Sequence, residues 1–579
     1  MNVIAVIGAR LNSSRLAGKH LLPLAGKPLI ERLVERLKQC DTLTHLTLAT
    51  TADAYNRPLV DWTKDHIRCS PYQGDVNDLM GRIDSVVQGL QPDILVYICG
   101  DCPLIAPDFI DYSVNKLIEN PDYDTLELYD HVESIHEGMH FYRREGWVKL
   151  MQHSQTAMEK EHVGYANKQK NFLKILKVDD CDNYAGVKQR ISVDTPADYA
   201  FMQSIYQSWY KTHAENSIVS LKWVMKQLMS DKQLAQINAH VMQKKPDHHY
   251  QKVSLFCHVD PSIGMGHLKR CALIATTLQE TFGLGTQIYI CGEARECGWL
   301  QGQFSWLKNE QQLFTQMEMD QSQAWILDFH PAYIDQQQLK NMCKNIKNSR
   351  KLFVMAMDKM NGLLDVVDQL FIPSFYTALS SDKISSGWEN YILSPATVCE
   401  KSNQITLLTG GSDALGYGEI LPNILKNKIP QSWSVEWIQG PYAKPPILCV
   451  NKHEGTGEAG GIFKQWHLHH HPENLAQIIA ASKIIITCYG LMLMEAMQSG
   501  ASVILLPVKG LTSEAELSVL REAKCCFIAD DIESIPRLLT NLFENNPLDM
   551  QYKRNAKRLL SGIQGAKKIG ALCMQYFES

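Results

Sequence analysis

The sequence predicts an α/β protein with three α/β domains, of which the last two are paired across a cleft. Short runs of β-branched residues alternate with helical patterns along most of the chain, as sheets with helical crossovers require. The chain has 579 residues, of which 45% are hydrophobic and 21% are charged, so its composition is that of a globular protein. This length exceeds that of one domain several times.

The expected elements fall into three groups along the chain. Strands are predicted in the first group at residues 2–7, 43–50, 93–99 and 190–193, in the second at 253–259, 324–327 and 352–357, and in the third at 405–409, 434–438, 483–487 and 501–507. A purely helical pattern over residues 216–243 closes the first group, and a polar segment follows it. We therefore expect a first domain at 1–245, a linker at 246–251 and two lobes at 252–398 and 399–579.

Charge and hydropathy exclude several classes of protein. The net charge is −5, which gives no general attraction to nucleic acid or to anionic lipid. No apolar run approaches the roughly 18 residues that span a bilayer, and the first residues lack the pattern of a signal peptide. Among 16 cysteines, Cys99 and Cys102 alone have CxxC spacing, which favours free thiols over a zinc site or disulfides. We expect a cytoplasmic protein without nucleic-acid or membrane partners.

A loop with three cations follows the first expected strand. Arg10, Arg15 and Lys19 stand among small residues that allow backbone N–H groups to approach a ligand. Such a loop suits a polyphosphate, although three basic residues in a loop are also commonly solvated. It matches neither a GxGxxG nor a Walker A pattern.

Two carboxylates are candidates for a metal site. Gly100 and Asp101 follow an apolar strand, at the strand end where open α/β sheets bind ligands. Thr195 and Asp198 are explained as the cap and third position of a helix, which leaves Asp194 without a structural role. Two carboxylates from separate strand ends match the preference of Mg²⁺ for few protein ligands.

These motifs resemble those of the cytidylyltransferases related to spore coat polysaccharide, CMP-sialic acid and CMP-pseudaminic acid synthesis, over nearly all of residues 1–245. The resemblance implies a nucleotide-diphospho-sugar transferase fold and attack of a sugar-acid hydroxyl on the α-phosphate of CTP. It also implies catalytic roles for Arg10 and Lys19, nucleotide contacts from Arg15 and Gly100, and Mg²⁺ on Asp101 and Asp194. The acceptor sugar stays open.

A second nucleotide site is expected after the strand at 253–259. Gly264 and Gly266 permit a tight turn into a helix, and His267 falls in its first turn, where the helix dipole favours a neutral base. A lone histidine is more often structural, but a Gly-x-Gly-His turn at a strand end favours a catalytic role.

The last lobe supplies further nucleotide-binding candidates. A backbone-rich turn at Gly410, Gly411 and Ser412 can cradle an anion, and Gly490 begins a strand-turn-helix that carries Glu495. The two oxygens of Glu495 are sufficient to bind both ribose hydroxyls of a nucleotide.

Together these features resemble a two-domain GT-B fold and, specifically, the UDP-sugar hydrolase of pseudaminic acid synthesis. The resemblance implies that His267 activates water to release UDP without a cofactor. A true glycosyltransferase and a non-catalytic nucleotide-sugar sensor stay open as alternatives for this half. The implied pathway adds a nonulosonic acid synthase as a candidate partner, with CTP, a sugar acid and a UDP-sugar as substrates, and leaves a homodimer open.

A group of histidines, His467, His469, His470 and His471, has no carboxylate or cysteine at metal-site spacing. We expect these residues to lie in a surface loop, with adventitious metal binding as the alternative.

Overall fold

A computed structural model describes the chain except residues 14, 76, 182–183, 185, 243–250, 295–299, 301–302, 395, 398, 441, 449–464, 471, 473, 508–511 and 545. It divides into two compact units. The first contains Met1–Tyr250 with the short segments Gln279–Gly283 and Gln301–Gln303, and the second contains the remainder. The division at Tyr250 falls in the expected linker, of which residues 246–250 lie outside the described part of the chain.

The first unit contains a seven-stranded sheet with the order β5-β4-β1-β6-β8-β7-β9. Strands β5, β4, β1 and β6 are parallel, whereas β8 is antiparallel to both β6 and β7. The strands are β1 (Val3–Gly8), β4 (His45–Thr51), β5 (Arg68–Tyr72), β6 (Ile94–Cys99), β7 (Thr125–Leu128), β8 (Met139–Arg143) and β9 (Ile175–Val178), with a separate hairpin of β2 (Pro23–Leu24) and β3 (Lys27–Pro28).

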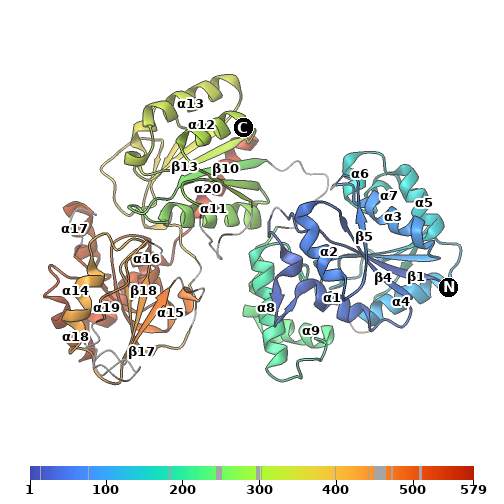
Figure 1. Ribbon diagram of the computed structural model, residues 1–579, viewed down its shortest axis with the longest axis horizontal. Helices are drawn as coiled ribbons and strands as arrows, with labels where there is room; N and C mark the ends of the chain where they lie inside the picture. Colours follow the sequence, from blue (N-terminus) through green and yellow to red (C-terminus); the bar gives the residue numbers. More distant parts are fainter. Residues whose placement is uncertain are drawn as a thin grey trace. The chain divides into compact units, whose positions relative to one another are not determined.

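Helices cover both faces of this sheet (Figure 1). Alternate residues of β1 pack to opposite sides: Val3, Ala5 and Ile7 join one core, and Ile4 and Val6 join the other. The helices are α1 (Leu29–Leu37), α2 (Arg57–Thr63), α3 (Leu79–Leu90), α4 (Pro107–Glu119), α5 (Arg144–His153), α6 (Ala157–Glu161), α7 (Tyr165–Lys170), α8 (Pro196–Tyr210), α9 (Leu221–Ser230) and α10 (Lys232–Gln236), and η1 (Lys19–Leu21) and η2 (Ala54–Asn56) are short 3-10 turns.

The second unit begins with a parallel sheet of the order β12-β11-β10-β13-β14-β15-β16. Figure 1 shows α12 and α13 over one face of this sheet and α11 and α20 on the other. The strands are β10 (Lys252–His258), β11 (Gly285–Cys291), β12 (Phe304–Leu307), β13 (Ala324–Asp328), β14 (Phe353–Met357), β15 (Gln369–Phe371) and β16 (Ile384–Ser385). The helices are α11 (Gly266–Phe282), α12 (Glu310–Met319) and α13 (Gln336–Ser349), with the 3-10 turns η3 (Pro331–Tyr333), η4 (Asn361–Leu363) and η5 (Trp388–Asn390).

A second parallel sheet follows, with the order β19-β18-β17-β20-β21-β22. The strands are β17 (Ser402–Leu408), β18 (Ser434–Gln439), β19 (Trp466–His470), β20 (Ser482–Thr487), β21 (Ser502–Leu505) and β22 (Phe527–Ile528). The helices are α14 (Tyr417–Leu425), α15 (Leu475–Ala481), α16 (Leu491–Gln498), α17 (Glu514–Ala523), α18 (Ile535–Phe543), α19 (Pro547–Leu560) and α20 (Gly565–Glu578).

The carboxy-terminal helix α20 returns to the preceding lobe. The ring of Tyr576 lies 5.1 Å from that of Phe353 on β14, and the ammonium group of Lys351 lies 5.1 Å from the centre of the Tyr576 ring. Two parallel sheets, with the terminal helix of the second packed against the first, form a GT-B-like pair of lobes. The predicted fold class is therefore confirmed: a Rossmann-like nucleotidyltransferase domain precedes a GT-B-like fold.

The structure corrects one predicted strand. Residues 190–193 form no strand; β9, at Ile175–Val178, is the last strand of the first sheet. The backbone N–H groups of Ile191 and Ser192 both donate to Glu137 Oε1. Because this side chain takes the hydrogen bonds that a neighbouring strand would accept, the segment is extended but does not pair with the sheet. Within the described residues, no helix combines the length and the apolar character needed to cross a membrane.

Candidate functional site

The cation-bearing loop after β1 is held in a compact turn. Leu11 N–H donates to Asn56 Oδ1 at 2.7 Å, and Gly18 N–H donates to Leu11 O at 2.9 Å. Gly18 has φ of 65°, a left-handed conformation that few other residues adopt, and the 3-10 turn η1 starts directly after it. The loop therefore returns on itself and delivers Lys19 to the carboxyl edge of the sheet.

Lys19 joins the two predicted metal ligands. Its Nζ lies 2.5 Å from Asp101 Oδ2 and 2.7 Å from Asp194 Oδ1, and its side chain is only 7% exposed. Asp101 follows β6, and Asp194 precedes α8, 93 positions later in the chain. The backbone also connects the two segments, because Val193 N–H donates to Asp101 O at 2.8 Å. Two carboxylates thus converge on one positive charge.

The electrostatics of the cluster favour its charged form. Burial by itself would lower the pKa of Lys19, but the charges of Asp101 and Asp194 outweigh it and raise that pKa above its ordinary value. Burial likewise opposes ionisation of Asp194, but Lys19, Arg15 and Arg190 hold its pKa well below the ordinary value. Lys19 and Asp194 are therefore each held in the charged form.

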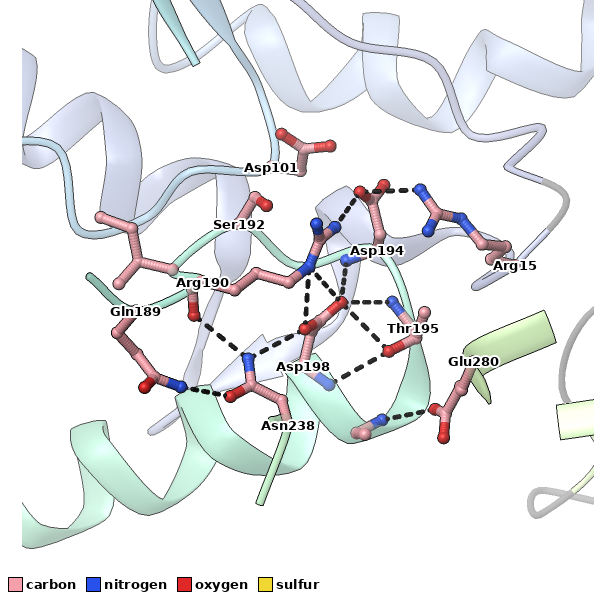
Figure 2. Close-up of polar contacts among 12 residues, drawn as sticks. Arg15, Asp101, Gln189, Arg190, Ser192, Asp194, Thr195, Asp198, Asn238 and Glu280 are labelled. Atoms are coloured by element: carbon pink, nitrogen blue, oxygen red, sulfur yellow. Dashed lines mark hydrogen bonds and ion pairs between the residues drawn. The ribbon is translucent and has the colours of Figure 1, made fainter. Parts of the chain in front are cut away.

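Two arginines flank Asp194, as Figure 2 shows. Arg15 Nη2 lies 2.8 Å from Asp194 Oδ2, and Arg190 binds the same oxygen from the other side. Arg190 also donates through Nε to Asp198, whose side chain is fully buried. The sequence analysis did not identify Arg190 as a site residue. Its spacing is nevertheless informative, because residues 190, 192 and 194 of an extended segment lie on the same side, which favours a contact between Arg190 and Asp194.

The capping arrangement predicted at the start of α8 is confirmed. The Thr195 side chain accepts from Asp198 N–H, the Asp198 side chain accepts from Thr195 N–H, and Pro196 occupies the first helical turn. Asp198 accepts a further hydrogen bond from Asn238 Nδ2 at 2.9 Å (Figure 2). Asp198 is thus committed to structure, and Asp194 is left to face Lys19.

Arg10 and Gly100 lie beside this cluster with separate contacts. Arg10 Nη1 lies 3.0 Å from Asn77 Oδ1, and its Nη2 lies 3.3 Å from Glu161 Oε1. Gly100 N–H donates to Gly8 O at 2.9 Å, and a Cβ at Gly100 would lie 2.9 Å from that oxygen. Glycine is therefore required where β1 and β6 end side by side.

A cavity of about 400 Å³ opens next to the loop. The ends of β4 and β5 contribute to its wall, which places it at the same carboxyl edge where parallel sheets bind ligands. Its lining residues are Asn12, Thr51, Ala52, Asp53, Tyr72, Gln73 and Gly74.

In the second unit, His267 forms a dyad with a buried carboxylate. His267 is the second residue of α11, and its Nδ1 lies 2.7 Å from Oδ1 of Asp328, the last residue of β13. The Asp328 side chain is fully buried, whereas that of His267 is 14% exposed. A cavity of about 80 Å³ lies against His267, lined also by Phe329, His330, Pro331, Asp358 and Lys359. With Nδ1 engaged, the ring can act through Nε2.

Arg270 binds both carboxylate oxygens of Asp328. Its Nε and Nη2 lie 2.7 Å and 2.5 Å from the two Asp328 oxygens, and Nη1 lies 3.2 Å from Asp358 Oδ2. Burial opposes ionisation of Asp328, but the Arg270 and His267 charges hold its pKa well below the ordinary value. Asp328 therefore presents a fixed negative charge to His267.

The predicted glycine turns meet near this dyad. Gly264 has φ of 74°, and a Cβ on it would lie 3.6 Å from Gly411 Cα. Gly410 has φ of 89°, and Gly490, with φ of 134°, precedes α16. Backbone from both lobes thus approaches closely at Gly264 and Gly411, whereas a Cβ at Gly410 or Gly490 would meet no described atom within 4 Å, so these two glycines are favoured by their positive φ alone.

The predicted ribose ligand is paired with a lysine. Glu495 Oε1, on α16, lies 2.7 Å from Nζ of Lys269, which is two residues after His267. Ser412 lies in the bend after β17 and Gly266 is the first residue of α11, but within the described residues no contact defines a ligand role for either. The nucleotide-binding roles of Gly264, Gly266, Gly410, Gly411, Ser412, Gly490 and Glu495 remain predictions.

The histidine group does not lie in a surface loop, contrary to expectation. His467, His469 and His470 belong to the edge strand β19, and His471 lies outside the described residues. A carboxylate also partners two of them: Glu436 Oε1 lies 2.9 Å from His467 Nδ1, and its Oε2 lies 2.6 Å from His469 Nε2. Sequence spacing does not reveal this partner, because Glu436 belongs to the neighbouring strand β18.

Residues 4–245 match the family model described as cytidylyltransferase. An uncharacterized protein of Methanocaldococcus jannaschii is 25% identical over 245 residues, which cover 42% of this chain and 97% of that protein. The 3-deoxy-manno-octulosonate cytidylyltransferase of Pelobacter propionicus is 30% identical over 137 residues, 24% of this chain and 52% of that enzyme. The chain thus spans about half the length of this enzyme.

Among solved structures, the UDP-GlcNAc 2-epimerase of Neisseria meningitidis, bound to UDP-GlcNAc, is 15% identical and gives a TM-score of 0.38. The similarity covers 56% of this chain and all of that chain. The amino-terminal domain is thus similar to cytidylyltransferases, and the two parallel sheets of the second unit form the GT-B-like pair of lobes.

Proposed function

We propose that the amino-terminal domain transfers a cytidylyl group from CTP to a sugar acid. In this reaction the anomeric hydroxyl oxygen bonds to the α-phosphorus, the bond from that phosphorus to the β-phosphate bridge breaks, and pyrophosphate leaves. The hydroxyl proton passes to solvent or to a nearby base. The match of residues 4–245 to cytidylyltransferases supports this class of reaction.

The observation that carries the proposal is the convergence of Lys19, Asp101 and Asp194 at the carboxyl edge of the sheet. Lys19 is buried and charged, so it can bind a phosphate strongly in a region of low dielectric. Arg15 supplies a second cation beside Asp194, and Arg10 supplies a third at the adjoining wall. The cavity of about 400 Å³ is large enough for the nucleoside portion of CTP.

Asp101 and Asp194 also suit Mg²⁺. They offer hard oxygen ligands, and they already lie around a positive charge, that of Lys19. A bound Mg²⁺ would neutralise phosphate charge and orient the polyphosphate. In this arrangement Lys19 moves from the carboxylates to the substrate, while Arg15 and Arg190 keep Asp194 ionised.

The acceptor is proposed to be a 3-deoxy-2-ulosonic acid, the class that includes octulosonic and nonulosonic acids. The similar enzymes of Pelobacter propionicus and Shewanella act, by their names, on 3-deoxy-manno-octulosonate and 8-amino-3,8-dideoxy-manno-octulosonate. The test is pyrophosphate release from CTP with a panel of such acids, including pseudaminic and legionaminic acids. Release with none of the panel would contradict the proposal.

A variant tests the metal ligand. Asp101→Asn keeps the shape of the side chain but removes its charge, so we expect Mg²⁺-dependent pyrophosphate release to fall by about 100-fold or more, as for loss of a charge-stabilising group. Asp111→Asn is a matched control, because Asp111 lies on α4 and accepts from the backbone N–H of Thr42. Full activity of Asp101→Asn would exclude Asp101 as a ligand.

For the GT-B-like half, we propose hydrolysis of a UDP-sugar with His267 as the base. Water would attack the anomeric carbon, its proton would pass to His267 Nε2, and the bond to the UDP oxygen would break. The Asp328 contact to Nδ1 supports this role, because it orients the ring and stabilises the positive charge that forms.

One experiment separates this reaction from its alternatives. The full chain is incubated with a UDP-diacetamido-trideoxy sugar without an acceptor. Free sugar and UDP in equal amounts support hydrolysis. Turnover that requires an added sugar acceptor indicates a glycosyltransferase, and binding without turnover indicates a sensor.

A further inference from the structure

A cluster of three unlike donors, two of them with buried side chains, lies in the first unit, apart from the Lys19 site. His136, Asp180 and Cys181 each offer one ligand atom, and these atoms lie within 4.8 Å of one another. His136 precedes β8, and the other two follow β9. Because β7 and β9 are parallel neighbours, the segments that leave their carboxyl ends meet at one edge of the sheet.

The histidine and the carboxylate are buried without adequate partners. Their side chains are 3% and 1% exposed, and His136 Nε2 lies 3.3 Å from Asp180 Oδ1. Within the described residues, neither ring nitrogen of His136 makes a hydrogen bond, nor does Asp180 Oδ1. Buried polar groups normally find partners, since leaving them unpaired costs free energy.

The surroundings hold these groups in place. Asp180 Oδ2 accepts from Ser134 Oγ at 2.6 Å, which leaves Oδ1 directed to the cluster. The His136 ring stacks on Phe109 with centroids 3.8 Å apart and meets Tyr184 edge-on at 4.8 Å. Hydrogen bonding of a ligand carboxylate by a second residue is a common feature of metal sites.

We propose that His136, Asp180 and Cys181 bind a divalent transition-metal ion of the Zn²⁺ class. A nitrogen, an oxygen and a sulfur ligand form a donor set of the borderline softness that Zn²⁺ accepts, with a fourth position left for water. A simple His136–Asp180 ion pair would make no use of the Cys181 thiol. This site is separate from the one proposed for Mg²⁺.

The ion would brace the wall of the cytidylyltransferase site. Glu137, next to His136, accepts the N–H groups of Ile191 and Ser192, which lead directly to Asp194.

The test is a Co²⁺ titration of the full chain after chelator treatment, in buffer that contains Mg²⁺. A His467→Gln/His469→Gln background removes the imidazole pair on β19 that could bind the ion adventitiously. We expect one equivalent of Co²⁺, visible absorption typical of tetrahedral coordination, a thiolate-to-cobalt charge-transfer band, and displacement by Zn²⁺.

Variants assign the ligands. Cys181→Ser should lose the charge-transfer band, and His136→Gln and Asp180→Asn should each weaken binding by at least about 100-fold, more than is usual for residues that only hydrogen-bond to a ligand. Cys69→Ser and His131→Gln, a half-buried thiol and an exposed imidazole of the same unit, should change neither quantity.

Two results would overturn the proposal: no charge-transfer band in the background protein, or an unchanged band in Cys181→Ser. If a ligand variant fails to fold by circular dichroism, the spectrum of the background protein decides. Metal binding should persist in Asp101→Asn, so failure of this proposal can be distinguished from failure of the proposed cytidylyl transfer.

Discussion

Replacement of Arg190 by methionine tests whether this arginine positions Asp194 for catalysis. Arg190 is 11% exposed and binds two carboxylates, Asp194 and the fully buried Asp198. Methionine keeps much of the side-chain volume and removes the guanidinium. The change therefore isolates the charge and hydrogen bonds of Arg190 from its packing.

The cost in stability follows from the contacts that remain. Breaking a buried ion pair commonly costs about 3–5 kcal/mol when one charge is left alone. Here Asp194 keeps Lys19 and Arg15, and Asp198 keeps hydrogen bonds from Thr195 and Asn238. We therefore expect a smaller loss of about 1–3 kcal/mol in the free energy of unfolding, the value of one or two charge-assisted hydrogen bonds.

We also expect a loss of activity that is separate from the loss of stability. With Asp194 released on one side, we expect kcat/KM for CTP to fall about 10- to 100-fold, the usual effect of removing a residue that orients a metal ligand. The Mg²⁺ concentration for half-maximal rate should rise. Pyrophosphate release measured against Mg²⁺ concentration, at a temperature where both proteins are folded, gives both quantities.

Arg36→Met is the matched control. Arg36 is a still more deeply buried arginine of the same unit, but it binds the backbone carbonyls of Ile105 and Val219 rather than the site. It should lose stability with an unchanged Mg²⁺ dependence. If Arg190→Met loses no more activity than Arg36→Met and needs no more Mg²⁺, Arg190 is structural and the positioning argument fails.

Three further outcomes are expected. Lys19→Met should abolish cytidylyl transfer, measured as pyrophosphate release, because the phosphate groups of CTP lose the buried cation proposed to bind them; normal turnover would remove Lys19 from the mechanism. Asp328→Asn should lower UDP release by about 10²- to 10⁴-fold by freeing the His267 ring, whereas Asp368→Asn, paired with Lys347 in the same lobe, should not; equal effects would refute the dyad. Burial, then the Lys19 charge, lowers the pKa of His20 from 6.5 to about 3, so the unfolded chain binds a proton below pH 6.5 that the folded chain excludes. The contribution of neutral His20 to the free energy of unfolding is complete above pH 6.5 and is lost as the pH falls toward 3, with a loss of about 2–3 kcal/mol at pH 4.5. In urea unfolding, His20→Gln should therefore show a smaller difference in stability between pH 7 and pH 4.5 than the unmodified protein, and an equal difference would contradict this.

Sequence patterns predicted the helix starts and strand ends that are fixed by contacts between residues close together in the chain. Thr195, Pro196 and Asp198 specify the start of α8 by their own contacts, which is why Asp194 could be recognised as free of a capping role. Strand ends such as Asp101 could also be placed, since a ligand edge follows from parallel pairing alone.

The same reasoning failed where partners come from distant parts of the chain. The extended residues 190–193 have strand-like composition, but Glu137 takes two of their N–H groups. The imidazoles of His467 and His469 meet Glu436 across a strand pair, 31 and 33 positions away. Neither contact has a fixed sequence spacing, so no motif could reveal it.

The sequence by itself predicted three stretches of α/β structure, the loop cations and the carboxylates Asp101 and Asp194, because strand alternation, glycine turns and helix caps act over a few residues. Tertiary structure alone decided that Lys19 bridges Asp101 and Asp194, that Arg190 holds Asp194, and that Asp328 orients His267. These pairings depend on which strands become neighbours, and that choice is set by the packing of the whole sheet rather than by any local segment.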